Sequence, residues 1–393
     1  MNYIFLEMKF KIGDCSSLEL AKIYGTPLYV YDKIMILQRI KELKEAFPNV
    51  QICYAVKANS NQEILKLIAA EGLGADCSNR IELEYARRAG FEMSKCIFTS
   101  VNPKNEDLEK ALELDVLINL DDISIFKRLV KIGTPDKICF RINPGFGKGK
   151  FPGIVVGGHG TKFGMNEDLT LEAFKLAKSF GVKRFGIHMM TGSCVLNEEY
   201  FEELTLVIQD IVERLEKTLN IKFESIDIGG GLGVPYEKHE RKLNLKSIGD
   251  KISIIYRHPA KLIMEPGRFI VAESGTLLTE VTTIKNNFIG VDAGMSTLLR
   301  PALYGAYHPI ILANNTEAEF VQEINIVGPI CENTDFFAKN RAMPKINEGD
   351  ILAIQVVGAY GFVMASQYNG ILRPAEVLVE HSEHKLIRER ELI

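Results

Sequence analysis

The chain has 393 residues, of which 46% are hydrophobic and 25% are charged, and its formal net charge is -4 at pH 7. This length predicts two domains, and the composition is that of an ordinary globular protein rather than a disordered one. The small negative charge gives no basic excess for nucleic acids or anionic membranes, so local groups would have to hold any anionic ligand.

The first segment, from Met1 to Asp14, mixes apolar residues with Glu7, Lys9 and Lys11. It is too interrupted for the apolar centre of a signal peptide, and no apolar stretch of the chain approaches the roughly 20 residues of a membrane span. Seven cysteines occur without CxxC pairs, which is typical of a reducing compartment and argues against a disulfide framework or a zinc site. The sequence therefore predicts a cytoplasmic protein.

A predicted strand at 28–31 is followed by eight short β-branched runs, most of them separated by amphipathic stretches of helical period. The eight runs are 52–56, 74–77, 96–99, 116–119, 138–143, 184–189, 225–228 and 261–264. Helices are predicted between them, for example at 61–71, 80–90 and 105–113. This alternation predicts a closed parallel (β/α)8 barrel, and an open doubly wound sheet is the alternative.

Several of the predicted barrel strands end in polar or glycine-rich residues. These ends are Lys57-Ala58-Asn59, Asp76-Cys77-Ser78, Arg141-Ile142-Asn143, Thr191-Gly192-Ser193, Gly229-Gly230-Gly231 and Glu265-Pro266-Gly267-Arg268. The carboxyl ends of barrel strands share one rim, where active sites are built. We therefore expect the functional groups to gather there.

After residue 272 the pattern changes to β-rich runs separated by glycine and proline, at 275–283, 288–292, 351–357 and 376–379. They predict an all-β domain with a sandwich or barrel-like fold. The strand at 28–31 precedes the barrel and could join this sheet. The predicted division is a barrel domain at 33–271 and a discontinuous β-domain formed by 1–32 and 272–393.

Lys57 stands at the end of a run that is predicted to be a buried strand. A buried ammonium is costly and tends to lose its proton. The neutral amine then forms Schiff bases with carbonyls, including that of pyridoxal phosphate. The alternative is a lysine with a packed stem and its head in water.

The glycines at 229–231 follow a predicted strand, so their N–H groups could approach a phosphate closely. A plain tight turn is the alternative. Glu265 and Arg268 offer a carboxylate beside a guanidinium, which could also be a structural ion pair. With Lys57 they supply what pyridoxal phosphate needs: an amine, a phosphate cradle and an acid for the ring nitrogen.

Taken together, the motifs resemble those of the alanine-racemase-type (fold type III) pyridoxal phosphate-dependent decarboxylases, and within them the diaminopimelate decarboxylases. The matching motifs, in chain order from residue 24 to 390, are Tyr54-Ala55-Val56-Lys57-Ala58-Asn59, Gly229-Gly230-Gly231, Glu265-Pro266-Gly267-Arg268, Asp292-Ala293-Gly294-Met295, Arg300-Pro301-Ala302-Leu303-Tyr304, Cys331-Glu332, Gly358-Ala359-Tyr360-Gly361 and Arg373-Pro374-Ala375-Glu376. The resemblance implies a carbon-carbon lyase of lysine biosynthesis that converts meso-2,6-diaminopimelate to L-lysine and carbon dioxide.

The resemblance also implies roles for single residues. Lys57 would hold the cofactor covalently and Glu265 would pair with its pyridine nitrogen. The cofactor's phosphate would be bound by Ser193, Gly230, Gly231, Gly267, Arg268 and Tyr360. The substrate would be bound by Arg268, Arg300, Tyr304, Glu332 and Tyr360. Cys331 would protonate the carbanion left by carbon dioxide, as a general acid, and no metal is implied.

In such enzymes Cys331 and Glu332 reach the active site of the other subunit, so the resemblance implies a homodimer. Neither nucleic acid nor a membrane is expected as a partner. Taken alone, Cys331 would be a small buried hydrophobe and Glu332 a surface charge. It is the joint occurrence of the motifs in order that favours the functional interpretation.

The sequence departs from the family pattern at three places. Met190 stands where a histidine usually lies over the cofactor ring, and the 145–164 segment lacks the usual His-Pro and Ser-Thr-Gly elements. Asn333 follows Glu332 where a serine is usual. These departures leave open the decarboxylation of another amino acid or amino acid derivative. A racemase and a pyridoxal phosphate carrier are further alternatives, and the Cys331 motif argues against both.

Overall fold

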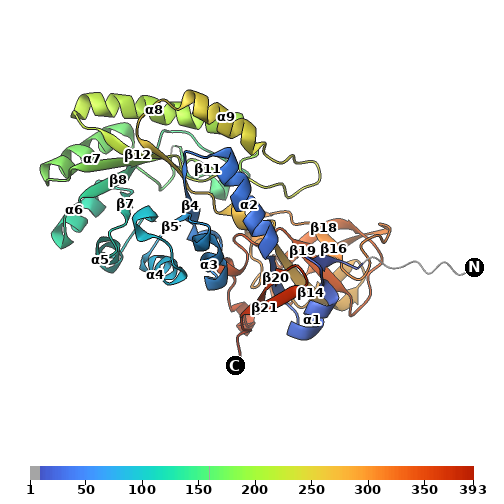
Figure 1. Ribbon diagram of the computed structural model, residues 1–393. Coiled ribbons are helices and arrows are strands. Elements are labelled where there is room, and N and C mark those ends of the chain that lie inside the picture. The colour runs from blue at the N-terminus through green and yellow to red at the C-terminus, as the bar shows by residue number, and fades with distance from the viewer. Residues whose placement is uncertain (1–8, 159) are drawn as a thin grey trace, which may run out of the picture. The chain divides into compact units, whose positions relative to one another are not determined.

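The computed structural model describes residues 9–158 and 160–393, so most of the first segment and one residue of the 145–164 segment lie outside them. The chain divides into two compact units. We call Arg39–Val234 with Arg241–Ile270 the barrel unit. The described part of Met1–Gln38, with Pro235–Glu240 and Val271–Ile393, is called the β-unit (Figure 1).

The barrel unit contains a closed barrel of parallel strands, which confirms the predicted (β/α)8 fold and excludes the open sheet. Within the described residues its strands, in chain order, are β4 (Gln51–Ala55), β5 (Gly74–Cys77), β6 (Ile97–Ser100), β7 (Leu117–Leu120), β8 (Lys137–Arg141), β10 (Arg184–His188), β12 (Phe223–Asp227) and β13 (Lys261–Met264). Around the barrel the order closes by pairing β13 with β4 and β8 with β10.

Helices follow most of these strands, as Figure 1 shows for α3 to α9. Helix α2 (Lys33–Ala46), which begins in the β-unit, precedes β4. The other barrel helices are α3 (Gln62–Ala70), α4 (Arg80–Ala89), α5 (Asn105–Glu113), α6 (Ile123–Ile132), α7 (Glu167–Ser179), α8 (Glu199–Leu219), α9 (Leu245–Ile255) and α10 (Arg268–Val271). Asn79 and Asn166 accept hydrogen bonds from the first N–H groups of α4 and α7, which explains where these helices begin.

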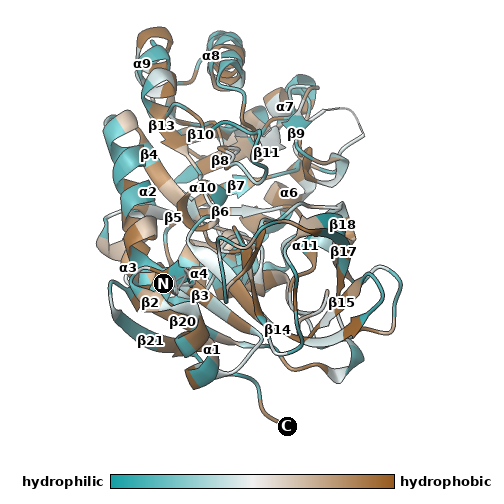
Figure 2. Ribbon diagram, turned by 90° about the vertical axis from the view of Figure 1, so that its right-hand side faces the viewer, coloured by the Kyte–Doolittle hydropathy of each residue, from teal (hydrophilic) through white to brown (hydrophobic). Residues whose placement is uncertain are grey.

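The barrel helices bury one side only. On α8 the buried residues include Phe201, Leu204, Ile208 and Leu215, at helical spacing. Figure 2 shows hydrophobic and hydrophilic residues on this same helix. In the part of the chain that the structure describes, no helix is long and apolar enough to cross a membrane.

Two short elements position the rim of the barrel. Val56–Ala58 form a 3-10 turn, η1, directly after β4, so the strand ends one residue earlier than predicted. The short strands β9 (Lys148–Gly149) and β11 (Gly192–Ser193) pair with each other in parallel. The pairing ties the 145–164 segment to the residues that follow β10.

The β-unit is built on a sheet in which strands from both ends of the chain pair. Its strands are β3 (Leu28–Asp32), β14 (Gly275–Lys285), β15 (Phe288–Val291), β16 (Ile310–Leu312), β17 (Gln322–Val327), β18 (Phe336–Met343), β19 (Ile351–Gln355), β20 (Ala375–Glu380) and β21 (Glu383–Arg388). β3 pairs antiparallel with β14 and parallel with β20. The strand predicted at 28–31 therefore joins this sheet, as expected.

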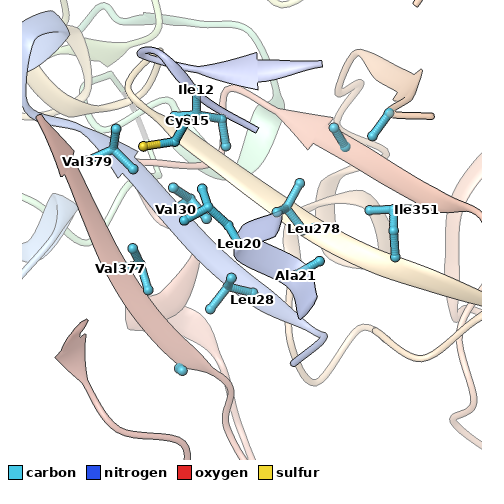
Figure 3. Close-up of a cluster of buried hydrophobic side chains, with 13 residues drawn as sticks. Ile12, Cys15, Leu20, Ala21, Leu28, Val30, Leu278, Ile351, Val377 and Val379 are labelled. Atoms are coloured by element: carbon cyan, nitrogen blue, oxygen red, sulfur yellow. The ribbon is translucent and has the colours of Figure 1, made fainter. Parts of the chain in front are cut away.

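A cluster of buried side chains fixes β3 in the β-unit (Figure 3). Leu28 and Val30 of β3 pack with Leu278 of β14 and Val377 of β20. The cluster also holds residues of the hairpin β1 (Lys11–Ile12) and β2 (Cys15–Ser16) and of α1 (Ser17–Tyr24). Each fully buried aliphatic side chain contributes about 1.5 to 3 kcal/mol, so this core makes the pairing of distant segments favourable.

Candidate active site

Five neighbouring strands of the barrel carry ionisable side chains at one rim. In barrel order, His188 ends β10, Asp227 ends β12, Glu265 follows β13, Lys57 follows β4 and Asp76 lies within β5. Because the carboxyl ends of parallel barrel strands face the same way, adjacent strands bring these groups together. The structure thereby joins Lys57 and Glu265, two of the predicted site residues, with three residues that were not assigned roles.

Lys57 Nζ donates a hydrogen bond to Asp76 Oδ2. The lysine side chain is 43% exposed and that of Asp76 is fully buried. Of the two alternatives for Lys57, the structure therefore shows the lysine whose head lies in water, directly after the strand end at η1. Burial and the negative charge of Glu265 raise the pKa of Asp76 to about 7, although the Lys57 ammonium opposes the rise.

Glu265 lies in a buried group with His188 and Asp227. His188 Nε2 is 3.3 Å from Glu265 Oε2, and both side chains are buried. Burial opposes ionisation of Glu265, but its neighbours His188 and Lys57 outweigh burial and hold its pKa at about 2. Burial and the charge of Glu265 raise the pKa of Asp227 well above its usual range. Asp227 therefore holds a proton beside an ionised Glu265.

His188, Asp227 and Glu265 also offer ligand atoms within 4.8 Å of one another, which is the spacing of a candidate metal site. A protonated Asp227 offers a cation little charge, because a ligating carboxylate must be deprotonated. Asp227 Oδ1 already accepts a hydrogen bond from the Gly229 N–H at 2.8 Å. The group therefore fits the support of an ionised Glu265 better than a metal.

The glycine turn after β12 leaves no room for side chains. A Cβ on Gly230 would lie 2.5 Å from the carbonyl oxygen of Glu265, and one on Gly229 would lie 2.6 Å from Met190 Sδ. Gly231 has φ +104, a backbone conformation that favours glycine. Gly230 N–H donates to Met190 Sδ at 3.2 Å. The methionine that replaces the usual histidine thus lies against this turn.

Ser193 and Arg268 lie at the same rim. Arg268 begins α10 and is buried, and its Nη2 lies 3.4 Å from Ser193 Oγ on β11. Gly267 is packed against Ala55 and Ala58, where an added Cβ would lie 2.9 Å from the Cβ of each. The structure thus brings Ser193 and Arg268 together, and both can donate hydrogen bonds to an anion.

These residues fit pyridoxal phosphate. Glu265 is a buried, ionised acid whose Oε1 has no hydrogen-bond partner among the described residues. It can therefore hold a protonated ring nitrogen. Lys57 presents a half-exposed amine for the aldehyde, and the tight glycine turn lets backbone approach a phosphate.

The divergent 145–164 segment is held by two residues at the end of β8. Arg141 Nη2 donates to the carbonyl oxygens of Val156 and Met190, each at 3.2 Å. Asn143 Nδ2 donates to the carbonyl oxygens of Gly158 and Phe163. The segment is therefore fixed to the rim by side chains of the barrel.

In the β-unit, Arg300 and Tyr304 lie on the short helix α11 (Arg300–Tyr304). Arg300 is 2% exposed, its Nη1 lies 3.0 Å from His308 Nε2, and its Cζ lies 4.7 Å from the centroid of the Tyr236 ring. It is therefore not an ordinary surface charge. Tyr360 is also in the β-unit, is half-buried and has φ +55.

Cys331 and Glu332 lie on the loop between β17 and β18. All seven cysteines fall in the described residues, and Cys331 is exposed whereas the other six are buried. Glu332 accepts hydrogen bonds from Thr334 Oγ1 at 2.5 Å and Tyr368 Oη at 2.9 Å. These bonds lower the pKa of Glu332. The hydroxyl beside Glu332 thus comes from Thr334 rather than from residue 333.

Sequence reasoning missed the roles of Asp76, Asp227 and His188 at the rim. A charged residue inside a short apolar strand is the signal that could have found Asp76 and Asp227, because burying a carboxylate is costly unless it is paired. His188 lies two residues before Met190, which occupies the usual place of the ring-stacking histidine. Its contact with Glu265 depends on strand order around the barrel, which no local pattern shows.

The model of the family described as pyridoxal-dependent decarboxylase, pyridoxal binding domain, matches residues 34–272. The diaminopimelate decarboxylase of Methanothermobacter thermautotrophicus is 39% identical, over 97% of this chain and 92% of that protein. The one from Campylobacter jejuni is 38% identical, over 95% of each.

Solved structures give the same result. The crystal structure of diaminopimelate decarboxylase from Helicobacter pylori complexed with L-lysine superposes with a TM-score of 0.90 at 37% identity, and covers 95% of this chain and 96% of that one. The enzyme from M. jannaschii in co-complex with L-lysine gives a TM-score of 0.90 at 33% identity, over 98% and 94%.

Proposed function

The chain belongs to the pyridoxal-dependent decarboxylase family, and from this premise we propose that it converts meso-2,6-diaminopimelate to L-lysine and carbon dioxide. Its cofactor is pyridoxal 5'-phosphate and its substrate is a small amino acid. One observation carries the use of the cofactor: the Lys57–Asp76 pair and the buried, ionised Glu265 lie on adjacent strand ends of one barrel. The similarity to diaminopimelate decarboxylases supports the choice of substrate.

When bound, pyridoxal phosphate supplies an aldehyde that bonds to amines and a protonated ring that takes up an electron pair. Lys57 Nζ would hold the aldehyde carbon, with Asp76 beside it to accept a proton. Glu265 would keep the proton on the ring nitrogen, because His188 holds this carboxylate in its ionised form. Phosphate binding is assigned to Ser193, Gly230, Gly231, Gly267, Arg268 and Tyr360.

The residues assigned to the substrate are Arg268, Arg300, Tyr304, Glu332 and Tyr360. Arg268, Arg300 and Tyr304 would bind its distal carboxylate, for which guanidinium groups are suited. Glu332 would bind the distal ammonium. Cys331 Sγ–H would donate a proton to the carbon from which carbon dioxide leaves. The exposure of Cys331 supports this role, because a buried thiol could not reach a substrate.

The assembly and location of the chain follow as further parts of the proposal. We assign it to a homodimer with shared active sites and to the cytoplasm, in lysine biosynthesis. The proposed domain division is a pyridoxal phosphate-binding barrel at 33–271 and a β-domain at 1–32 and 272–393. Gel filtration with light scattering tests the dimer, and a mixture of Lys57→Ala and Cys331→Ala chains tests whether subunits share sites by restoring activity.

Release of carbon dioxide tests the reaction. The purified, cofactor-loaded protein is given meso-diaminopimelate, and in parallel ornithine, lysine, arginine and glutamate, with Lys57→Ala as the blank. We expect release from diaminopimelate alone and a loss of at least about a thousandfold in the blank, because the covalent hold on the cofactor is removed.

A different amino acid or amino acid derivative is the second candidate. Met190 and the divergent 145–164 segment favour it, because both border the rim of the barrel. Carbon dioxide from another amino acid, with none from diaminopimelate, would replace the proposed substrate and keep the reaction class.

A further inference from the structure

We propose that Tyr368 and Thr334 are specificity-determining residues, whose hydroxyls hold the Glu332 carboxylate where it binds the ammonium at the far end of the substrate. The inference rests on the function proposed above. Neither residue belongs to the motifs that connect the chain to its family, and the two lie 34 positions apart in the sequence. The structure shows that both hydroxyls donate a hydrogen bond to Glu332.

The two hydroxyls act on different oxygens of Glu332. Thr334 Oγ1 donates to Oε1 at 2.5 Å and Tyr368 Oη donates to Oε2 at 2.9 Å. A carboxylate has about four acceptor sites, so each oxygen keeps capacity for a further donor. An ammonium carries three donors and no acceptor. The remaining sites on Glu332 therefore suit an ammonium and give no partner to a second carboxylate.

The hydroxyls also favour the ionised form of Glu332. Hydrogen bonds to the ionised form lower its pKa, with Thr334 contributing most and Tyr368 next. The side chain is exposed, so a lone glutamate there would sample many rotamers. Two donors on opposite oxygens restrict its orientation. A charge held in place discriminates better between substrates than a mobile one, because a wrong end group then leaves it unpaired.

The loop that carries Glu332 is itself fixed. The buried Asp335 accepts hydrogen bonds from the N–H groups of Met295 and Ile330, at 2.6 and 2.8 Å. Thr334 Oγ1 also lies 3.7 Å from Met295 Sδ. The hydroxyl of Thr334 is therefore part of a rigid turn rather than of a loose surface loop.

Helix α11, which carries Arg300 and Tyr304, lies beside this loop. Pro301 and Ala302 of the helix and Asn333 and Thr334 of the loop line one cavity, and Figure 2 shows α11 next to β18. The helix that carries Arg300 and Tyr304 and the loop that carries Glu332 thus border one cavity within the β-unit. Tyr368 reaches Glu332 from a separate turn, η5 (Tyr368–Gly370).

The test compares two substrates that differ only in the distal amine. Rates of carbon dioxide release are measured with the holoenzyme for meso-diaminopimelate and for 2-aminopimelate, which lacks that amine. We expect Tyr368→Phe and Thr334→Val each to lower kcat/KM for diaminopimelate about tenfold, mainly through KM, because a charge-assisted hydrogen bond is lost. The rate with 2-aminopimelate should not change, and Thr334→Ser should behave as the wild type.

A matched control is Tyr24→Phe, which removes another exposed hydroxyl bond, the one between Tyr24 Oη and His384 Nδ1 at 2.7 Å. It should leave both substrates unaffected. An equal loss for the two substrates in Tyr368→Phe, or no loss for either, would overturn the inference while the wild type still turns over diaminopimelate. A wild type that releases no carbon dioxide from diaminopimelate would overturn the proposed function instead.

Discussion

The rim of the barrel and the Cys331–Glu332 loop of the β-unit hold their charges in opposite ways. At the rim, Asp76, Asp227 and Glu265 are buried, and burial together with their neighbours sets their pKa values. On the loop, Cys331 and Glu332 are exposed, and hydrogen bonds fix the position of the carboxylate. Burying a carboxylate changes its pKa and lowers the stability of the fold. An exposed carboxylate costs little stability and can still select between substrates.

The largest effect is expected for a substitution of Glu265 at the rim. We expect Glu265→Gln to lower carbon dioxide release about a thousandfold, because a neutral amide cannot hold the ring proton. The unfolding midpoint should not fall, since the change removes a buried charge and Asp227 can donate to the amide oxygen. Turnover assays and thermal unfolding measure the two effects.

Glu216→Gln is the matched control. Glu216 is also buried, but it accepts hydrogen bonds from Lys222 Nζ at 2.6 Å and from the Phe223 N–H at 2.8 Å, away from the rim. The same substitution there should lower the midpoint and preserve turnover. If both variants lost stability and kept activity, Glu265 would be a structural residue.

The second largest effect is expected for Asp76, in the way the free energy of unfolding depends on pH. The folded, cofactor-free chain keeps the Asp76 proton up to a pKa of about 7, whereas the usual value is 3.8. The folded state therefore binds more protons across this window, and stability falls as pH rises through it. Asp76→Asn should lack this fall and gain on the order of 3 kcal/mol relative to the wild type between about pH 4 and about pH 8.

Urea unfolding of cofactor-free protein at both ends of the window measures this difference. The control is Asp122→Asn, which changes an exposed carboxylate at the start of α6. Its stability should follow the wild-type pH profile. Parallel profiles for Asp76→Asn and the wild type would mean that Asp76 is ionised in the folded chain at every pH tested.

The smallest effect is expected for a substitution of Asp335, which fixes the Cys331–Glu332 loop. Asp335→Ala leaves the N–H groups of Met295 and Ile330 without their acceptor, which costs about 2 kcal/mol. We expect a lower unfolding midpoint and a higher KM for diaminopimelate. Asp122→Ala also removes an acceptor for a backbone N–H, that of Ser124, and should leave KM unchanged. An unchanged KM in Asp335→Ala would show that the rigidity of the loop does not affect substrate binding.

Much of the fold was predictable, because each barrel strand is a short apolar run bounded by polar residues. The runs at 74–77 and 261–264 and the helix at 105–113 match β5, β13 and α5. Lys57 and Glu265 were found from their positions at strand ends. For Lys57 the apolar pattern left a buried and a partly exposed side chain open, and the structure shows the second.

The site residues that were not predicted from the sequence meet in space although they lie far apart in the chain. Asp227 and Glu265 meet because β12 and β13 are neighbours, and His188 meets Glu265 across β12. Tyr368 meets Glu332 from a separate turn. Such pairs combine residues with no local periodicity or spacing, so a single sequence contains no pattern that would indicate them.

The pairing of β3 with β14 and β20 also affects how the chain folds as it is synthesised. Leu28 of β3 pairs with Leu278 and Ala375, so this strand leaves the ribosome long before either partner. At translation rates of about 5 to 20 residues per second, the delay is on the order of tens of seconds. The barrel strands emerge meanwhile. A nascent chain thus carries an unpaired apolar strand throughout barrel formation, which makes it a natural client for chaperones.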